Sequence, residues 1–161
     1  MPKRDVAYPA SFVLADVARL MRVELDKSVT EMGLDLSAGD IRALMNIVAA
    51  DGIRQCDLAK TMNVEPMTIS AYLDRLERND LVRRQMDPMD RRARVVYVSD
   101  LAKDVLNRVR PMLDQVYEQA MNGIDPRQRE STETALEIAR SNLSIRRGRD
   151  MGATNAPAAF S

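Results

Sequence analysis

The sequence predicts a mainly α-helical fold that carries one small β-hairpin, and three observations indicate it. Apolar residues recur at steps of three and four over most of the chain, which is the pattern of helices with one buried face. Between residues 81 and 98 the pattern changes to two short runs rich in β-formers, separated by a charged turn. The 161 residues, 45% of them hydrophobic and 30% charged, suit one or two small globular domains with a buried core.

In the first part of the chain the spacing predicts two helices. Residues 1–10 contain two prolines and no periodicity, so we expect a flexible lead-in. A long helix is predicted over Ser11–Met32, where apolar residues mark one face. A second helix begins after Ser37, which is a good N-cap, and Asp40 stands at the position that completes a capping box. It ends at Asp51.

Next come two shorter helices joined by a tight turn. They are predicted over Gln55–Met62 and Pro66–Asn79, and three residues separate them. This layout is typical of a helix-turn-helix, although two amphipathic helices with a tight turn often do no more than pack together. Burial of the seam leaves an outer face on the second helix that could approach base edges in a major groove: Pro66, Met67, Thr68, Ser70, Ala71, Asp74 and Arg75.

The predicted hairpin has strands over residues 81–86 and 94–98 and a charged tip between them. Five arginines against two aspartates give this segment a formal charge of +3, in a chain whose overall charge is zero. Arginines at a hairpin tip suit a narrow minor groove, whose negative potential attracts them. Asp90 stands two residues before Arg92, close enough to hold its guanidinium by a forked salt bridge. A solvated charged surface is the simpler alternative.

Arginine dominates the cations of the chain, with 20 Arg against four Lys. The planar guanidinium grips phosphates and guanine edges in a way that a lysine cannot. A GC-rich genome would produce the same excess, so the positions of the arginines carry the argument rather than their number.

The C-terminal part is predicted to return to long helices. Ser99 caps one that contains Pro111, where a kink is expected, and another begins at Asp125 and ends near Ser144. The segment 146–161 is rich in Gly, Ala and Pro, and we expect a disordered tail. The helices over 11–35 and 100–145 have more apolar surface than a small domain covers, which predicts a homodimer around a central lobe of residues 36–99.

The composition excludes several classes of chemistry. Without histidine there is no Ser-His-Asp or Cys-His arrangement, and the single cysteine, Cys56, can form neither an intrachain disulfide nor a tetrahedral zinc site. The six glycines form no phosphate-binding or nucleophile-elbow motif. We therefore expect no enzyme activity, no metal and no cofactor. Cys56 lies in the first turn of a predicted helix, where it is either redox-active or simply a small residue.

Apolar runs of only a few residues predict no membrane span, and the N-terminus has no signal-peptide pattern. The lack of a disulfide fits a reducing compartment. These features together predict a cytoplasmic protein.

From about Leu36 to Leu143 the chain resembles the MarR family of bacterial transcription regulators. The resemblance is carried by the run Thr68–Glu77, which ends in Asp-Arg-Leu-Glu, and by Asp87–Ala93, which has the pattern Asp-Pro-x-Asp-Arg-Arg. It implies a winged helix-turn-helix with long N- and C-terminal dimerisation helices and no enzyme activity.

The resemblance also implies a function. The helix from Pro66 would enter the major groove, and Asp90, Arg91 and Arg92 would lie at the minor groove. The dimer would present two such heads about one helical turn apart, ~34 Å, to a pseudo-palindromic operator of double-stranded DNA. The resemblance further implies a repressor that a small lipophilic or phenolic anion relieves. The alternative is a winged-helix module for protein–protein contacts without specific DNA binding.

Two departures from the family pattern stand out. Arg54 occupies a position where a Thr or Ser helix cap is common, and Ala102 stands where a Gly is usual. Arg54 could contact the DNA backbone instead, as could Arg84 and Arg94.

Overall fold

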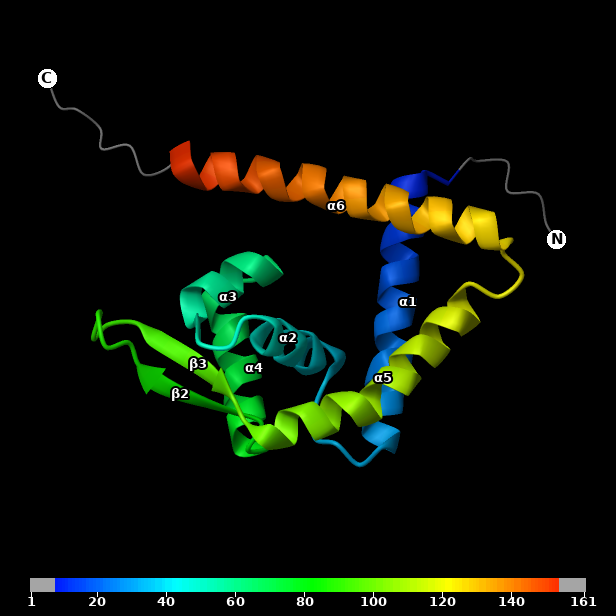
Figure 1. Cartoon of the computed structure of the whole chain (residues 1–161). Coiled ribbons are helices and arrows are strands. Elements are labelled where there is room, and N and C mark those ends of the chain that lie inside the picture. Colours follow the sequence, from blue (N-terminus) through cyan, green and yellow to red (C-terminus); the bar gives the residue numbers. More distant parts are fainter. Residues whose placement is uncertain (1–7, 154–161) are drawn as a thin grey trace, which may run out of the picture. The chain divides into compact units, whose positions relative to one another are not determined.

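The computed structural model describes residues 8–153 in two units, with side chains described for residues 8–144. One unit ends at Ala120 and the other begins at Met121 (Figure 1). Residues 1–7 of the predicted lead-in and residues 154–161 of the predicted tail lie outside the described residues. Within the described part, no helix is long and apolar enough to cross a membrane.

The first unit contains five helices and three strands among its described residues (Figure 1). Their order along the chain is α1 (Ala10–Glu31), α2 (Ala38–Ala49), β1 (Ile53–Arg54), α3 (Gln55–Met62), α4 (Pro66–Arg78), β2 (Val82–Met86), β3 (Arg94–Val98) and α5 (Asp100–Ala120). The predicted fold class, mainly helical with a small hairpin, is confirmed.

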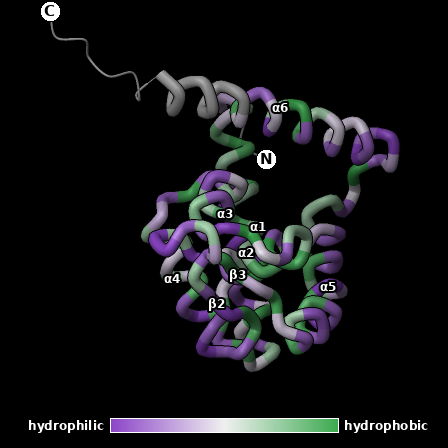
Figure 2. Tube along the Cα trace, turned by 60° about the vertical axis from the view of Figure 1, so that its left-hand side comes forward, coloured by the Kyte–Doolittle hydropathy of each residue, from purple (hydrophilic) through white to green (hydrophobic). Residues whose placement is uncertain are grey.

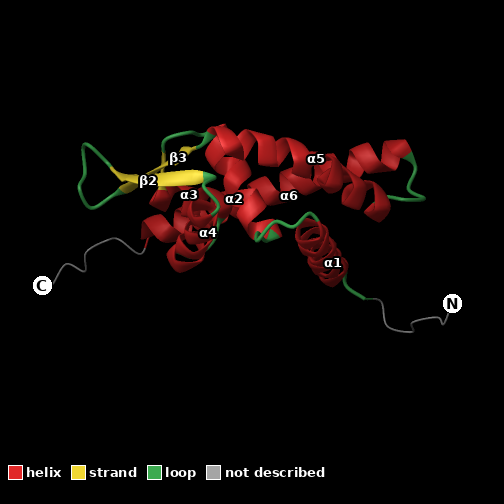
Figure 3. Ribbon diagram, turned by 90° about the horizontal axis from the view of Figure 1, so that it is seen from below, coloured by secondary structure: helices red, strands yellow, loops and turns green. Residues whose placement is uncertain are grey.

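The three strands form one antiparallel sheet in the order β1-β3-β2. Val82 pairs with Val98 and Met86 with Arg94, so the hairpin closes on the seven residues 87–93. Ile53, which lies between two predicted helices, pairs with Val96 and adds a third strand that was not predicted. Seen from below, the loop between β2 and β3 projects away from the helices of the first unit (Figure 3). We call this loop and its two strands the wing.

One apolar core holds the first unit together. It is formed where α2, α3 and α4 pack on one another, on the sheet and on parts of α1 and α5. The seam predicted between the two short helices is part of it. Residues with no exposed surface include Val29, Ala43, Leu44, Ile47, Leu58, Ile69, Leu73, Leu76, Val96, Ala102 and Val109.

Local sequence signals fix the boundaries of the central helices. Ser37 and Asp40 form the predicted capping box, each bonding the other's backbone N–H. Pro66 occupies the first turn of α4, where its missing N–H costs nothing. The backbone of Gly33 has φ +72°, a left-handed conformation that ends α1 and that other residues rarely adopt.

Ser99 does not cap α5 with its side chain as predicted. Its backbone N–H donates to the Leu81 carbonyl at 3.0 Å, which fixes the end of β3. The hydroxyl is buried by this arrangement and has no hydrogen-bond partner among the described residues. The following helix continues through Pro111, which removes one N–H from its ladder.

α1 is buried only towards its C-terminal end. Val29 has no exposed surface, whereas Val13, Val17, Leu20 and Val23 are between 42% and 54% exposed. The apolar face that the periodicity predicts is therefore real, but within a single chain its N-terminal part remains uncovered.

The second unit consists of the residues from Met121 onward and contains α6 (Pro126–Ala153). The guanidinium of Arg129 donates to the carbonyls of Met121 and Ile124, at 2.7 and 3.2 Å, and so closes the loop before the helix. The first part of α6, residues 127–134, is hydrophilic, and apolar residues are interspersed with polar ones over residues 135–144 (Figure 2). Leu136, Ile138 and Leu143 are exposed.

α6 extends beyond Ser144, where the periodicity predicted its end, and the predicted tail from residue 146 therefore begins as helix. The run after Ser144 contains no proline before the end of the helix, and Arg, Met and Ala are good helix formers. Gly148 and Gly152 cost about 1 kcal/mol each, which does not stop the helix before Ala153.

Candidate nucleic-acid interface

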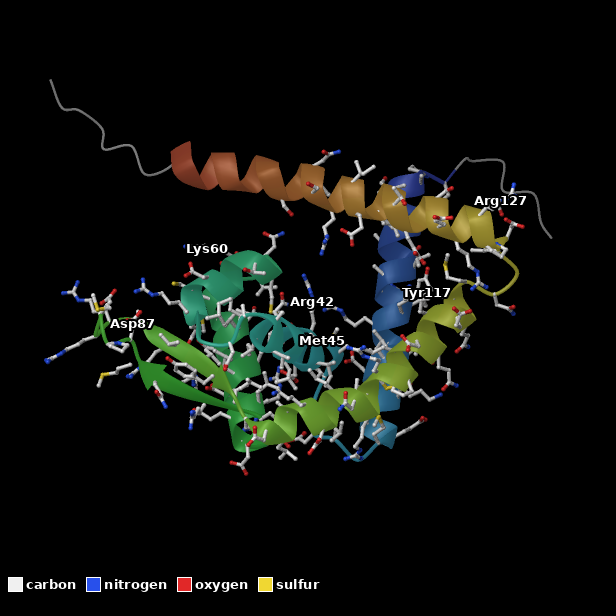
Figure 4. All side chains as sticks on the ribbon, viewed as in Figure 1. Arg42, Met45, Lys60, Asp87, Tyr117 and Arg127 are labelled. Carbon is white, nitrogen blue, oxygen red and sulfur yellow. The ribbon has the colours of Figure 1, made fainter. Side chains whose placement is uncertain are left out.

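The helix-turn-helix is formed by α3 and α4 and the turn between them. Asn63 adopts a left-handed conformation, φ 55°, which reverses the chain at the end of α3. The last carbonyl of α3, that of Met62, accepts a hydrogen bond from Arg42 of α2 at 3.2 Å (Figure 4). Ile69, Leu73 and Leu76 are fully buried, so the opposite side of α4 faces outward.

The first turn of α4 presents mostly apolar groups on that outward side. Pro66 and Ala71 are exposed, and Thr68 is half-buried. Met67 is 84% exposed, an unusual position for a large apolar side chain. This surface has hydroxyl, methyl and thioether groups but no charge.

At the N-terminus of α4, Pro66 has no N–H, and the N–H groups of Thr68 and Ile69 donate to the Glu65 carbonyl, which leaves that of Met67 for a ligand. The cap residue, Glu65, makes no side-chain hydrogen bond to the helix. Helix N-termini carry unpaired N–H groups and a partial positive charge, which favour phosphate oxygens. α3 also begins without a side-chain cap, at Arg54, as its departure from the family pattern suggested.

Ser70, one of the predicted base-contacting residues, is joined to α3. Its Oγ accepts a hydrogen bond from Nε2 of Gln55 at 2.8 Å. This bond ties the first turns of the two helices together.

Arg75 holds α4 onto α2. Its Nε donates to both carboxylate oxygens of the buried Asp40, at 2.9 and 3.1 Å. This pairing raises the pKa of Arg75 above its ordinary value. The guanidinium also lies 5.5 Å from the centre of the Tyr72 ring, and that ring packs so closely on Gly39 that a Cβ there would meet its hydroxyl at 2.6 Å.

Arg84 and Asp74 belong to a second ion-pair cluster. Nε of Arg84 donates to Glu77 at 3.0 Å, and its Nη2 lies 2.7 Å from Asp74. The hydrogen bond from Arg84 lowers the pKa of Glu77 and correspondingly raises that of Arg84. The cluster joins α4 to β2, and Arg84 is only about a quarter exposed, 24%.

Asp87 anchors the base of the wing loop (Figure 4). It is almost fully buried, and its Oδ1 accepts the N–H of Met89 at 2.8 Å. The guanidinium of Arg54 lies 2.6 Å from its other oxygen. The Met89 N–H, and then Arg54, lower the pKa of Asp87.

The tip of the wing is exposed and basic. Arg91 and Arg92 are exposed, and no ion pair within residues 8–144 involves either of them. The predicted forked salt bridge between Asp90 and the Arg92 guanidinium is not formed. Instead, Oδ1 of Asp90 accepts the backbone N–H of Arg92 at 3.0 Å, which is an Asx turn. Arg94, on the strand that leaves the tip, is also exposed.

The predicted contact residues therefore fall into two groups. One group offers side chains to an external partner: Pro66, Met67, Thr68 and Ala71 on α4, and Arg91, Arg92 and Arg94 on the wing. The other group has side-chain bonds within the chain or shapes its turns: Arg54, Ser70, Asp74, Arg75, Arg84 and Asp90. Sequence reasoning missed the partners Asp40, Glu77 and Asp87 as ion-pair residues. Only Asp40 had a signal, its place in a capping box.

The match to a family model agrees with this geometry. Residues 36–93, from the loop before α2 to the wing tip, match the model described as the MarR family. This segment, which includes the helix-turn-helix and most of the wing, is therefore similar to the MarR family.

Solved structures of MarR-family proteins share the fold. A MarR-family transcriptional regulator from Silicibacter pomeroyi is 28% identical, with a TM-score of 0.68 over 83% of this chain and 89% of that one. A MarR transcriptional regulator from Methanosarcina mazei Go1 is 24% identical, with a TM-score of 0.77 over 84% of this chain and 96% of that one. MepR from S. aureus, solved as a complex with DNA, is 20% identical, with a TM-score of 0.72 over 84% and 99%.

The family that residues 36–93 match consists of transcription regulators, which are not enzymes. Within the part of the chain that the structure describes, no group of three or more Cys, Asp or Glu residues could hold a metal ion.

Proposed function

We propose that this chain is a MarR-family transcription regulator, a homodimeric repressor that binds a pseudo-palindromic site in double-stranded DNA. In the proposal, α4 enters the major groove and Arg92, with Arg91, enters the adjacent minor groove. Arg94 contacts the phosphate backbone. Arg54 is 44% exposed beside Asp87 and reaches a phosphate from there.

The observation that carries the proposal is the pairing of an open helix N-terminus with a basic wing tip in one unit. α4 offers uncharged groups and the backbone N–H of Met67, while the wing offers Arg91 and Arg92 without internal partners among residues 8–144. A surface made only for protein contacts has no need of two unpaired arginines on a loop that projects from the helices (Figure 3). The narrow, negative minor groove attracts such side chains.

The exposed apolar surface of α1 supports the homodimer. Val13, Val17, Leu20 and Val23 leave about half of their surface in water, and Phe12 is 58% exposed. A contiguous apolar surface of this kind is typical of a protein interface. A second copy of the chain covers it symmetrically and supplies the second DNA-binding head.

We include in the proposal relief of the repressor by a small lipophilic or phenolic anion, which rests on the family resemblance alone. A groove of about 290 Å³ between α1 and α5 is lined by Glu24, Glu31, Ser28, Gln115 and Gln119, with Met32, Met112 and Val116. Its two carboxylates disfavour an anion. This groove therefore does not support the lipophilic or phenolic anion that the resemblance implies.

The proposal is tested by selecting duplexes from a random library with the purified chain and measuring their binding by fluorescence anisotropy at several salt concentrations. Arg92→Ala should weaken binding to the selected duplex by roughly 1–3 kcal/mol and reduce the salt dependence by about one phosphate-equivalent. Arg108→Ala removes the same charge from an exposed position on α5 and should leave affinity unchanged.

Equal affinities of wild type and Arg92→Ala would remove the minor-groove assignment. A selection that enriches no sequence, with binding that is weak and insensitive to salt, would instead favour the protein-interaction module.

A further inference from the structure

The exposed face at the start of α4 has a specific chemical character, and the inference drawn from it rests on the proposed function. We propose that this face recognises thymine through its 5-methyl group, with Met67 as the specificity-determining residue. The proposal names what the major-groove element reads, which neither the fold nor the wing decides.

The first observation is that the polar side chains of α4 that could bond to a base are already bonded within the chain. Arg75 is bound at two distances of about 3 Å to the buried Asp40, and Asp74 lies 2.7 Å from Arg84. Both would have to break ion pairs that hold α4 in place before they could reach a base. Ser70 already accepts a hydrogen bond from Gln55.

The second step concerns what remains. Met67 and Ala71 stand one helical turn apart and are both exposed, with the Thr68 methyl and hydroxyl beside them. The thioether of Met67 is 84% exposed, among the most exposed large apolar side chains of the described chain. At this exposure most of its surface is free of packing contacts within the chain.

The third step is the match to DNA. In the major groove only thymine presents an apolar group, its C5 methyl, and Ala and Thr methyl groups are established partners for it. A flexible thioether can adapt its position to a methyl group better than a branched side chain can. The face is therefore built for contact with thymine methyls rather than for bidentate bonds to guanine or adenine.

The experiment uses the full chain and the duplex selected as above. Each thymine is replaced in turn by deoxyuridine, which removes only the methyl group and leaves the base pair intact. At one or two positions in each half-site, we expect wild-type affinity to fall about fourfold, the equivalent of one buried methyl. At the same positions, 5-methylcytosine should bind more tightly than cytosine by a similar factor.

The variant Met67→Ala decides whether Met67 makes the contact. It should bind the thymine duplex about as weakly as wild type binds the deoxyuridine duplex, and it should no longer distinguish the two. Met89→Ala is the matched control, because Met89 is 90% exposed but lies on the wing, away from the major groove. It should preserve the full preference for thymine.

The outcomes separate this inference from the proposed function. If the selected duplex binds tightly but every deoxyuridine substitution is neutral in wild type, thymine-methyl recognition is overturned and DNA binding stands. If Met67→Ala keeps the preference for thymine, another residue reads the methyl and the assignment to Met67 is overturned. If no duplex is selected, both proposals fail together.

Discussion

At the scale of single residues, charged side chains of α4 hold the helix in place through ion pairs within the chain. Arg75 and Glu77 point to partners within the chain, Asp40 and Arg84. The outward face of the first turn is left uncharged. The helix that is proposed to read DNA is thus positioned by ion pairs and reads with apolar groups.

Arg75→Ala should destabilise the fold strongly. It leaves the carboxylate of Asp40 buried without its cationic partner, and breaking a buried pair in this way costs about 3–5 kcal/mol. The cost is expected at the lower end, because Ser37 still donates two hydrogen bonds to Asp40. The free energy of unfolding in urea measures this cost. The control is Arg78→Ala, at the exposed last residue of α4, which should change stability by less than about 0.5 kcal/mol.

A loss of no more than that in Arg75→Ala would mean that the Asp40 pair contributes nothing to holding α4. Arg75 would then be available for DNA, as the sequence interpretation had it.

These residues also show how far the sequence reaches. Ser37 and Asp40 could be recognised as a capping box because their spacing alone defines the motif. The partnership of Asp40 with Arg75, 35 positions away, depends on how α2 and α4 cross, and no local spacing encodes it. The same holds for Arg54 and Asp87, which meet only because β1 pairs with β3.

At the scale of the elements, the wing is held by one buried carboxylate at its base. Asp87 joins the loop to itself through the Met89 N–H and to β1 through Arg54. The position of the tip arginines relative to α4 therefore depends on an element that lies before the helix-turn-helix in sequence.

Asp87→Asn should lower stability at neutral pH, and the difference from wild type should vanish in acid. Because the pKa of Asp87 is lower in the folded chain than its ordinary value of 3.8, its contribution is present above that value. The contribution is lost as the pH falls through the lower, folded-state pKa. Thermal unfolding between pH 7 and pH 2 measures both curves.

Asp114→Asn, at an exposed position of α5, provides the control and should track wild type over the whole range. A constant difference between wild type and Asp87→Asn down to the lowest pH would contradict the role of the ionised carboxylate.

Elements were predictable where one local pattern decides them. The hairpin strands, the N-terminus of α4 and the end of α1 at Gly33 all follow from turn, proline and glycine chemistry. The end of α6 was missed because no strong stop signal occurs near Ser144, and periodicity alone does not end a helix. The hydroxyl of Ser99 was misassigned because tertiary contacts at Leu81 fix the backbone there.

At the scale of the whole molecule, the proposed homodimer makes use of the apolar surface that a single chain leaves open. Leu20→Glu should produce a monomer, because the side chain is 54% exposed in the single chain and a charge there would be buried on association. Sedimentation velocity measures the change, and the monomer should lose operator affinity because only one head remains. Met45→Glu adds the same charge at a 44%-exposed apolar position on α2 and should remain dimeric.

A Leu20→Glu variant that sediments as wild type does would exclude this part of α1 from the interface.

The neutral overall charge limits how the whole molecule can be attracted to DNA. With 24 cations against 24 anions, attraction to DNA cannot come from net charge and must come from the local charge of the wing.

The most direct test of the central claim, that paired winged heads read DNA, is a hydroxyl-radical footprint of the full chain on the selected duplex. Two protected regions should appear with their centres about one helical turn apart, ~34 Å. They should be symmetric about the centre of the site, and Arg92→Ala should remove protection at the minor groove of both halves together. A single protected region, or even protection without a centre of symmetry, would contradict the account.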